Sequence, residues 1–421
     1  MSSKTSAAAS DRSVVILGAS FAGQSAAHYI FKHVAPALEA HPSGASWKIH
    51  LIDPSTHFWW RPSAPRSIVT GDTVPHEKAF IPITEGFKQY ASSFTRVKLE
   101  VTHGECTSVD FDARTVKVKN LASGRSSDAE TVPYYALIIA SGTRTPTPLT
   151  SLQGNYTTSI TALDEMRTLL ASGKAKEIVI GGGGPVGVET AGELGEKLNG
   201  AAGFFSSTPA NPKAKITLVV GGDKMLPILR QSLSEKAEKL LRRVGVNVIY
   251  GARITSVDNE ASLEGKKTVH LDNGKILSAD VYIPAVGTKP NSEYLPSSML
   301  DSKGYVTVNA KTLRIDNVGP RVYCVGDVGN YSRGGVMALY DAIPVFATNF
   351  ANDLWEDLDN KKSQDKQFTS NLSETQVVPV GKDKGVGAFN GWQLPSFAVS
   401  MIKGKDYMLS MTGQIAHGTK W

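Results

Sequence analysis

The chain has 421 residues, of which 41% are apolar and 20% charged, and its formal net charge is +6. This composition is typical of globular proteins, and the length predicts two or three domains. The basic residues are scattered rather than gathered in a stripe, which argues against nucleic-acid binding. Only two cysteines are present, Cys106 and Cys324. Such a low count excludes a disulfide scaffold and a CxxC zinc site, so we expect no metal centre and a reducing compartment such as the cytoplasm.

The N-terminal residues and the lengths of the apolar runs indicate where in the cell the protein is expected. No stretch approaches the run of about 20 apolar residues that crosses a bilayer. The start, MSSKTSAAASDR, has no apolar signal core and carries Ser2 where myristoylation needs glycine. We expect residues 1–11 to be a disordered tail and the protein to be cytoplasmic. Because the tail is rich in Ser and Ala, mitochondrial association stays open. Peripheral membrane contact also stays open, and so does the choice between a monomer and a homodimer.

The first half of the chain predicts the opening of a parallel sheet. An apolar run at 13–17 ends in glycine, helix-like residues extend from Gly23 to about Ala40, and a second apolar run covers 47–52. Strand, tight turn, helix and strand in this order are typical of a βαβ unit. Residues 96–119 alternate apolar and polar side chains, which predicts a small antiparallel meander. A buried strand then ends at Ser141-Gly142.

The second half repeats this order from residue 177. An apolar run, a glycine cluster and a helix are followed by strands at 216–222 and beyond, with an amphipathic helix over 232–244. A last buried strand at 321–331 precedes a helix over 336–358. The chain therefore predicts an α/β fold with two Rossmann-like, three-layer nucleotide-binding domains and a small C-terminal α+β region. We expect the first domain over 12–148 and 289–352, the second over 149–288, and the C-terminal region over 353–421.

The first glycine motif is GASFAG, residues 18–23, directly after the strand VVIL. Such a turn brings the backbone close to a pyrophosphate, which then lies at the N-terminus of the following helix. Ser20 replaces the middle glycine of GxGxxG, and its hydroxyl could itself meet a phosphate oxygen. Asp53 ends the next strand, where a carboxylate binds a ribose hydroxyl, although it follows Gly23 by about 30 residues rather than about 20.

The second motif is GGGPVG, residues 182–187, a full GxGxxG between a strand and a helix. Two such turns in one chain are much more specific than one. The next strand ends in Gly221-Gly222 rather than in the acid that favours NAD over NADP. Lys224 nearby leaves NADPH open, and Asp223 could serve NADH if the register shifts. The choice between NADH and NADPH stays open.

Taken together, these motifs resemble the pyridine-nucleotide-dependent FAD oxidoreductases with two dinucleotide-binding domains. Within that family the chain looks closest to apoptosis-inducing-factor-like, ferroptosis-suppressor-type NAD(P)H:quinone reductases of fungi. The resemblance implies that FAD binds the first domain and NADH or NADPH the second. The motifs that carry the resemblance include Ala285-Val286-Gly287 and Val325-Gly326-Asp327. The residues expected to contact the cofactors are Gly18, Ser20, Phe21, Ala22, Gly23, Asp53, Arg61, Cys106, Ser141, Gly142, Gly182, Gly184, Pro185, Val186, Gly187, Gly287, Gly326 and Asp327.

Two of the expected site residues have a simpler structural alternative. We expect Glu189 in the first turn of the helix after the second glycine motif, where an acid stabilises the helix dipole. The resemblance implies instead that it orients the nicotinamide, as the catalytic residue. Arg61 follows the aromatic segment His57–Trp60, and the resemblance places it near the flavin. Packing of the two tryptophans is an equally good account of that segment.

The cysteine count also limits the electron acceptor. Disulfide reductases of this broad family carry a CxxxxC or CxxC pair, which this chain lacks. We therefore expect electrons to leave for a small-molecule acceptor, a quinone or oxygen. Two alternatives stay open: a reductase of a ferredoxin-like carrier, and a redox-gated signalling protein of the apoptosis-inducing-factor type.

Overall fold

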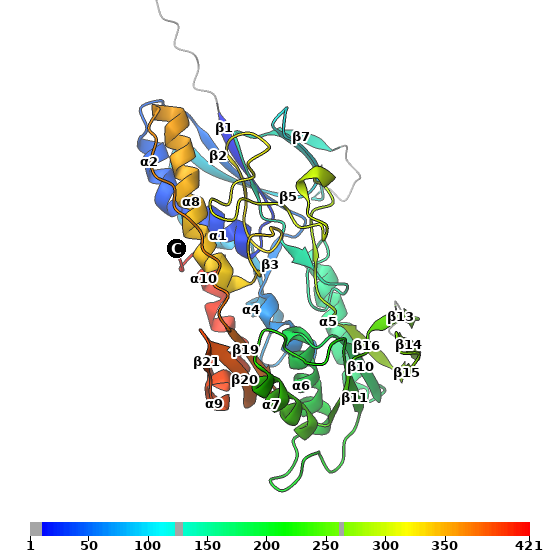
Figure 1. Cartoon of the computed structure of the whole chain (residues 1–421). Helices are drawn as coiled ribbons and strands as arrows, with labels where there is room; N and C mark the ends of the chain where they lie inside the picture. Colours follow the sequence, from blue (N-terminus) through cyan, green and yellow to red (C-terminus); the bar gives the residue numbers. More distant parts are fainter. Residues whose placement is uncertain (1–10, 123–128, 261–264) are drawn as a thin grey trace, which may run out of the picture.

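The computed structural model describes residues 11–122, 129–260 and 265–421 (Figure 1). The expected disordered tail, residues 1–11, lies outside these ranges except for its last residue. The predicted α/β class is confirmed, because the chain forms two separate parallel-rich sheets flanked by helices. In the described part of the chain, no helix is both long and apolar enough to cross a membrane.

The first sheet has seven strands in the order β18-β8-β1-β2-β5-β6-β7. β1 pairs in parallel with both β2 and β8. Its residues Val14 to Leu17 are therefore enclosed by neighbouring strands and are fully buried. The late segment β18 joins this sheet beside β8. The first unit is therefore built from both ends of the chain. The strands are β1 Arg12–Leu17, β2 Trp47–Asp53, β5 Val97–Asp110, β6 Thr115–Asn120, β7 Glu130–Pro133, β8 Ala136–Ile139 and β18 Val322–Cys324.

The antiparallel meander predicted over residues 96–119 is correct for its second half and wrong for its first half. β5 is one strand of 14 residues whose first half, Val97–His103, pairs in parallel with β2. Only its second half pairs antiparallel with β6, which in turn pairs with β7. Alternation of apolar and polar residues is the same in both arrangements, so the sequence pattern alone could not reveal the change of partner.

Helices cover the first sheet. The expected helix from Gly23 to Ala40 is present as three pieces, α1 Phe21–Tyr29, a π-helical turn Ile30–Val34 and α2 Ala35–Ala40. The long helix α8, Val336–Asp359, packs beside α1 (Figure 1). Because α8 continues to Asp359, the expected C-terminal region begins inside this helix.

The second sheet is fully parallel, in the order β12-β11-β10-β16, and resembles the first in its strand–turn–helix start. A three-stranded antiparallel sheet, β13-β14-β15, lies next to it. Helix α5, which we did not predict, packs into the core of this half. The elements are α5 Tyr156–Ala171, β10 Glu177–Gly181, α6 Pro185–Asn199, β11 Lys215–Val220, α7 Gln231–Arg243, β12 Val246–Tyr250, β13 Ile254–Asp258, β14 Lys267–Leu271, β15 Ile276–Ala279 and β16 Val281–Pro284.

The chain leaves the first half and returns to it through a two-stranded ribbon. β9 Thr143–Arg144 pairs antiparallel with β17 Lys289–Pro290. The proposed division of the chain at 148/149 and 288/289 falls close to this ribbon.

The remaining elements are short. A β3-β4 hairpin-like pair and small helices connect the two halves, and the C-terminal region combines a three-stranded sheet with helical turns. Their bounds are β3 His57–Trp59, η2 Arg61–Ser63, α3 Ala64–Ser67, α4 His76–Ala79, β4 Phe80–Pro82, η3 Glu85–Tyr90, η4 Ser297–Met299, β19 Gln376–Val380, β20 Lys384–Phe389, β21 Trp392–Gln393, α9 Ser396–Val399, η5 Ser400–Gly404, η6 Leu409–Met411 and α10 Thr412–Ala416.

Candidate functional site

The first glycine turn joins β1 to α1 and can be made only by glycine at its two ends. Gly18 has a φ of +103°, and a Cβ there would lie 2.5 Å from the carbonyl oxygen of Ala140. A Cβ on Gly23 would lie 1.7 Å from the carbonyl oxygen of Gly18. The helix therefore starts tightly against the strand, which leaves its N-terminal amides free to face an anion.

Asp53 holds this turn from the end of β2. Its carboxylate accepts hydrogen bonds from the amides of Ala19 at 2.6 Å and Ser55 at 2.7 Å. Burial raises the pKa of Asp53 to about 6, and the two amides oppose that rise. Ser20, at the N-cap position of α1, makes no side-chain bond to its own helix, so its hydroxyl is available to a ligand. Phe21 packs edge-on against Phe58, with ring centroids 4.9 Å apart.

The predicted Gly326-Asp327 segment meets the same helix N-terminus. Gly326 has a φ of +83°, and a Cβ there would lie 2.5 Å from the Cβ of Ala22. Its amide donates to the hydroxyl of Tyr331 at 2.8 Å, and Asp327 accepts a bond from the amide of Gly335 at 2.8 Å. Residues about 300 positions apart in the sequence thus form one cradle around the start of α1.

Arg61 begins the short helix η2 directly after the aromatic segment His57–Trp60. Its Nη1 donates to the carbonyl of Thr143 at 2.9 Å and its Nε to the carbonyl of Thr150 at 3.2 Å. Burial lowers the pKa of Arg61, and the negative charge of Asp327 opposes that effect. The tryptophans next to it, Trp59 and Trp60, are fully buried in the core, as the packing alternative expected.

Two expected contacts, Ser141 and Cys106, have side chains that bond within the protein. The hydroxyl of Ser141 donates to the carbonyl of Asn291 at 2.6 Å, and Gly142 beside it has a φ of +63°. Cys106, on β5, is half-buried, and burial raises the pKa of its thiol to about 12. Any contact of Ser141 with a cofactor would therefore use its backbone.

The second glycine turn, between β10 and α6, has the same construction and opens into a cavity of about 600 Å³. A Cβ on Gly182 would lie 2.1 Å from the carbonyl oxygen of Ala285, and one on Gly187 would lie 1.9 Å from that of Gly182. Gly184, the counterpart of Ser20, has open space where its Cβ would be. Five of the expected residues line the cavity, namely Gly182, Gly184, Pro185, Val186 and Gly287. Gly187 does not line the cavity; its lack of a side chain lets α6 pack closely against the glycine turn that follows β10.

Glu189 points away from solvent and is bound by a residue that sequence reasoning missed. It is 2% exposed, and its Oε1 lies 2.5 Å from Nζ of Lys403 in the C-terminal region. Burial raises the pKa of Glu189 to about 7, Lys403 lowers it, and the nearby Glu193 raises it.

A second buried ion pair lies one helical turn further along α6. Arg66 donates to both carboxylate oxygens of Glu193, at 2.8 and 2.9 Å, and its Nη1 donates to the carbonyl of Lys405 at 2.8 Å. Tyr407 donates its hydroxyl to Glu193 at 3.0 Å. The C-terminal segment 403–407 is thereby tied to α6 and to α3 of the first half.

Four large apolar side chains of the C-terminal region neither close a slot nor join its buried core. Phe389, Trp392, Phe397 and Met401 are all exposed, Trp392 by 81%. They form part of the outer surface of this region.

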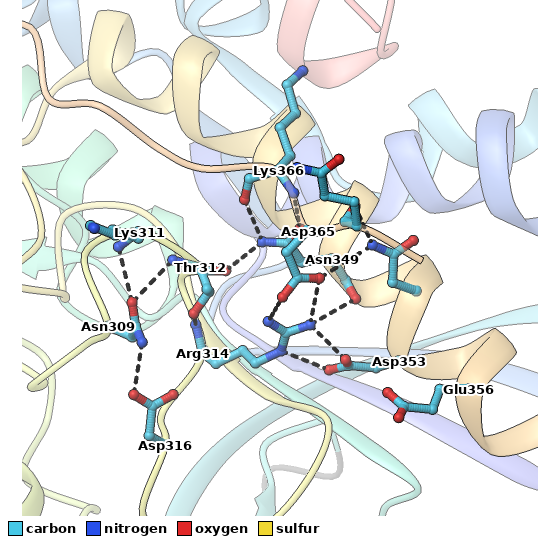
Figure 2. A network of polar contacts seen from close by, with 12 residues as sticks. Asn309, Lys311, Thr312, Arg314, Asp316, Asn349, Asp353, Glu356, Asp365 and Lys366 are labelled. Carbon is cyan, nitrogen blue, oxygen red and sulfur yellow. Dashed lines mark hydrogen bonds and ion pairs between the residues drawn. The ribbon is translucent and has the colours of Figure 1, made fainter. Parts of the chain in front are cut away.

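A second cavity, of about 550 Å³, is lined by charged residues at the far end of α8. Figure 2 shows Arg314 between Asp353 of α8 and Asp365 of the following segment. Nη2 of Arg314 lies 2.6 Å from Asp353, and Nη1 lies 2.5 Å from Asp365. Because Arg314 and its acids satisfy one another, we regard this network as structural. Among the described residues, no group of three or more His, Cys, Asp or Glu side chains could hold a metal ion.

Two Rossmann units that each aim a glycine turn at a dinucleotide define the class of protein, a two-dinucleotide-binding-domain reductase. The family model described as pyridine nucleotide-disulphide oxidoreductase matches residues 12–344, and the chain belongs to that family. Members of this family use FAD and NAD(P)H, and the cradles described above fit both groups.

Named proteins that are similar to the chain include members of this family. The chain is 42% identical to oxidoreductase phnG of Penicillium herquei over an alignment that covers 98% of each chain. It is 26% identical to ferroptosis suppressor protein 1 of Xenopus laevis, over 97% of each chain. The expected resemblance to that subgroup is confirmed.

Two further similarities are more distant. The chain is 25% identical to an external alternative mitochondrial NAD(P)H-ubiquinone oxidoreductase of Solanum tuberosum, over 71% of this chain and 54% of the other. The structure of the sulfide:quinone oxidoreductase of Aquifex aeolicus shares the fold, with a TM-score of 0.69, 14% identity and coverage of 97% and 92%.

Proposed function

We propose that the protein oxidises NAD(P)H and passes the electrons through FAD to a quinone or oxygen, without a redox-active disulfide. One observation carries this proposal. The cavity at the second glycine turn extends to Thr150, whose carbonyl accepts a hydrogen bond from Arg61, and the negative charge of Asp327 in the first cradle acts on the pKa of Arg61. This link through Arg61 supports a scheme in which the two dinucleotide sites adjoin, so that the two reactive rings can come together.

The residues of the chain have distinct tasks in this scheme. FAD supplies the two-electron redox chemistry when it is bound. The Gly18–Gly23 turn would bind its pyrophosphate with the amides at the start of α1, and Asp53 fixes the turn. Gly326-Asp327 would lie against the same helix start. Arg61, anchored by two carbonyls, would supply a positive charge to the bound flavin. Glu189, kept in place by Lys403, orients the nicotinamide.

The thiols are poor candidates for relaying electrons. Burial raises the pKa of Cys106 to about 12, and burial also raises the pKa of the fully buried Cys324 far above its ordinary range. Dithiol exchange needs a thiolate, and both sulfurs are held as neutral thiols at neutral pH. Electrons are therefore passed directly to an external acceptor.

The name of one relative supports a quinone as that acceptor. The protein from Solanum tuberosum is an NAD(P)H-ubiquinone oxidoreductase. The exposed apolar surface made by Trp392, Phe397 and Met401 provides a place where an apolar acceptor, or the membrane that contains it, can approach.

The acceptor is tested by rapid mixing of the FAD-loaded protein, reduced without oxygen by NAD(P)H, with a short-chain quinone, with oxygenated buffer and with an oxidised dithiol compound. We expect reoxidation by quinone or oxygen and none above the blank by the disulfide. Reoxidation by the disulfide alone would refute the proposal. The variant Cys324→Ser removes one of the two sulfurs that such a disulfide would need and is the matched control, and its reoxidation rate should equal that of the natural chain.

A further inference from the structure

The carboxyl end of β11 is the place where a Rossmann unit distinguishes NAD from NADP. Here β11 ends at Val220 and is followed by Gly221, which lines the cavity of the second glycine turn. Among the described residues that line this cavity, none is acidic. Asp223 is exposed and lies outside the lining, so it does not provide the carboxylate that binds a 2′-hydroxyl.

Arg253 lies directly against Gly221. It stands between β12 and β13 and also lines the cavity. A Cβ on Gly221 would be 3.0 Å from Cγ of Arg253, 3.4 Å from Nε and 3.7 Å from Cδ. The absence of a side chain at Gly221 therefore makes room for the arginine stem, which passes over the end of β11.

The backbone of Arg253 is fixed, whereas its side chain is exposed. Its amide donates to Oδ1 of Asp272 at 2.9 Å, and its carbonyl accepts from the amide of Asp272 at 2.9 Å. Within the described ranges, no carboxylate forms an ion pair with the guanidinium. Lys224, the other cation that the sequence suggested, is used differently, because its Nζ donates to the carbonyl of Leu229 at 2.6 Å.

We propose that the second dinucleotide site is selective for NADPH and that Arg253 binds its 2′-phosphate. A guanidinium presents two parallel N–H donors that match phosphate oxygens, and its positive charge offsets the added negative charge. NADH would leave the guanidinium without that partner and would find no carboxylate for its 2′-hydroxyl. This inference rests on the proposed function, since it names the coenzyme of that same site.

The test uses two nucleotides that carry no redox group, 2′,5′-ADP and 5′-AMP, titrated calorimetrically into the full-length chain. We expect 2′,5′-ADP to bind about 10- to 100-fold more tightly, the range of a charge-assisted pair. Arg253→Met should abolish that difference and leave 5′-AMP binding unchanged. Arg253→Lys should retain part of it. Lys275→Met, at an exposed position in the β14–β15 turn, is the matched control for loss of one positive charge and should retain all of it.

Two results would overturn the inference. One is equal binding of the two nucleotides by the natural chain, and the other is an unchanged ratio in Arg253→Met. Flavin absorbance of the same samples separates this inference from the proposed function. A colourless protein that still prefers 2′,5′-ADP would contradict the redox function and support the Arg253 site. A yellow protein that NADH bleaches as readily as NADPH would support the redox function and contradict the proposed selectivity for NADPH.

Discussion

Glu189 and Lys403 form a buried ion pair across 214 residues of sequence, with Nζ 2.5 Å from Oε1. The carboxylate belongs to the helix that follows the nucleotide-binding turn, and the ammonium belongs to the C-terminal region. The pair therefore connects the last segment of the chain to the nucleotide site. The charge of Lys403 keeps the pKa of Glu189 lower than burial alone would allow.

Removing Lys403 should move the pH dependence of the reductive step. The pKa of Glu189 is about 7 with Lys403 present, so Lys403→Met should raise it further. If ionised Glu189 orients the nicotinamide, the rate of flavin bleaching at pH 7 should fall about tenfold and recover at higher pH. Rapid-mixing rates across pH 6 to about 9 would measure the shift. Lys403→Arg should restore the profile, and the exposed neighbour Lys405→Met should not change it; a profile unmoved by Lys403→Met would contradict this role.

The same pair gives stability a definite pH dependence. The pKa of Glu189 is raised in the folded chain from 4.5 to about 7, so the folded state retains a proton that the unfolded state releases. The free energy of unfolding should therefore fall as pH rises through this window. Lys403→Met should extend the loss above pH 7. Urea unfolding at several pH values would test the sign, and a variant whose stability rises through this window would show that the sign is wrong.

The Arg66–Glu193 pair should contribute more to stability than any surface pair. Arg66→Met leaves Glu193 buried with only the Tyr407 hydroxyl, and breaking such a pair costs about 3–5 kcal/mol. Arg66→Met combined with Glu193→Gln removes the uncompensated charge and should recover much of this loss. The measurement is the unfolding free energy of each variant, and equal instability of the single and double variants would speak against a charge effect.

Gly326 should control the binding of FAD through its contact with α1. In Gly326→Ala the new Cβ would lie 2.5 Å from the Cβ of Ala22, so the helix start must move away from the cradle. We expect the dissociation constant of FAD to rise about 5- to 150-fold, given that a buried clash costs about 1–3 kcal/mol. Gly287→Ala is a matched control, because it has a similar φ of +107° and open space around the added Cβ. It should retain FAD, and equal loss from both variants would attribute the effect to backbone strain alone.

Arg314 should matter for stability and not for redox activity. It bridges Asp353 of α8 and Asp365, as Figure 2 shows, and neither of these partners belongs to a glycine turn. Arg314→Met should lower the unfolding free energy by about 2 kcal/mol, while Arg242→Met, which breaks an exposed helix pair with Glu238, should change it by less than about 0.5 kcal/mol. Thermal unfolding measures both, and reduced NAD(P)H turnover in Arg314→Met would contradict its structural assignment.

Much of the fold is readable from the sequence because the glycine turns impose local rules. Gly18 and Gly182 occupy positive φ directly after buried strands, so strand, turn and helix follow one another without help from distant residues. Helix α5 had a usable signal that we missed, since Leu163, Met166 and Leu170 recur at helical spacing. The change of pairing along β5 had none, because the strand pattern is the same on either side of the change.

The residues of the candidate site could be predicted only where short sequence motifs determine their positions. The nucleotide-binding turns follow from spacing, and Glu193 could have been noted because it lies four residues after Glu189 on the same helix face. Lys403 and Arg253 reach the sites through tertiary contacts. No local pattern distinguishes them from the other lysines and arginines on the surface.

The most direct test of the account is the visible spectrum of the purified chain supplied with FAD and then mixed, without oxygen, with one equivalent of NADPH per bound flavin. The account predicts a yellow protein that loses its flavin colour on mixing and regains it when a quinone or air is added. A chain that takes up no FAD, or a bound flavin that neither NADPH nor NADH bleaches, would contradict it.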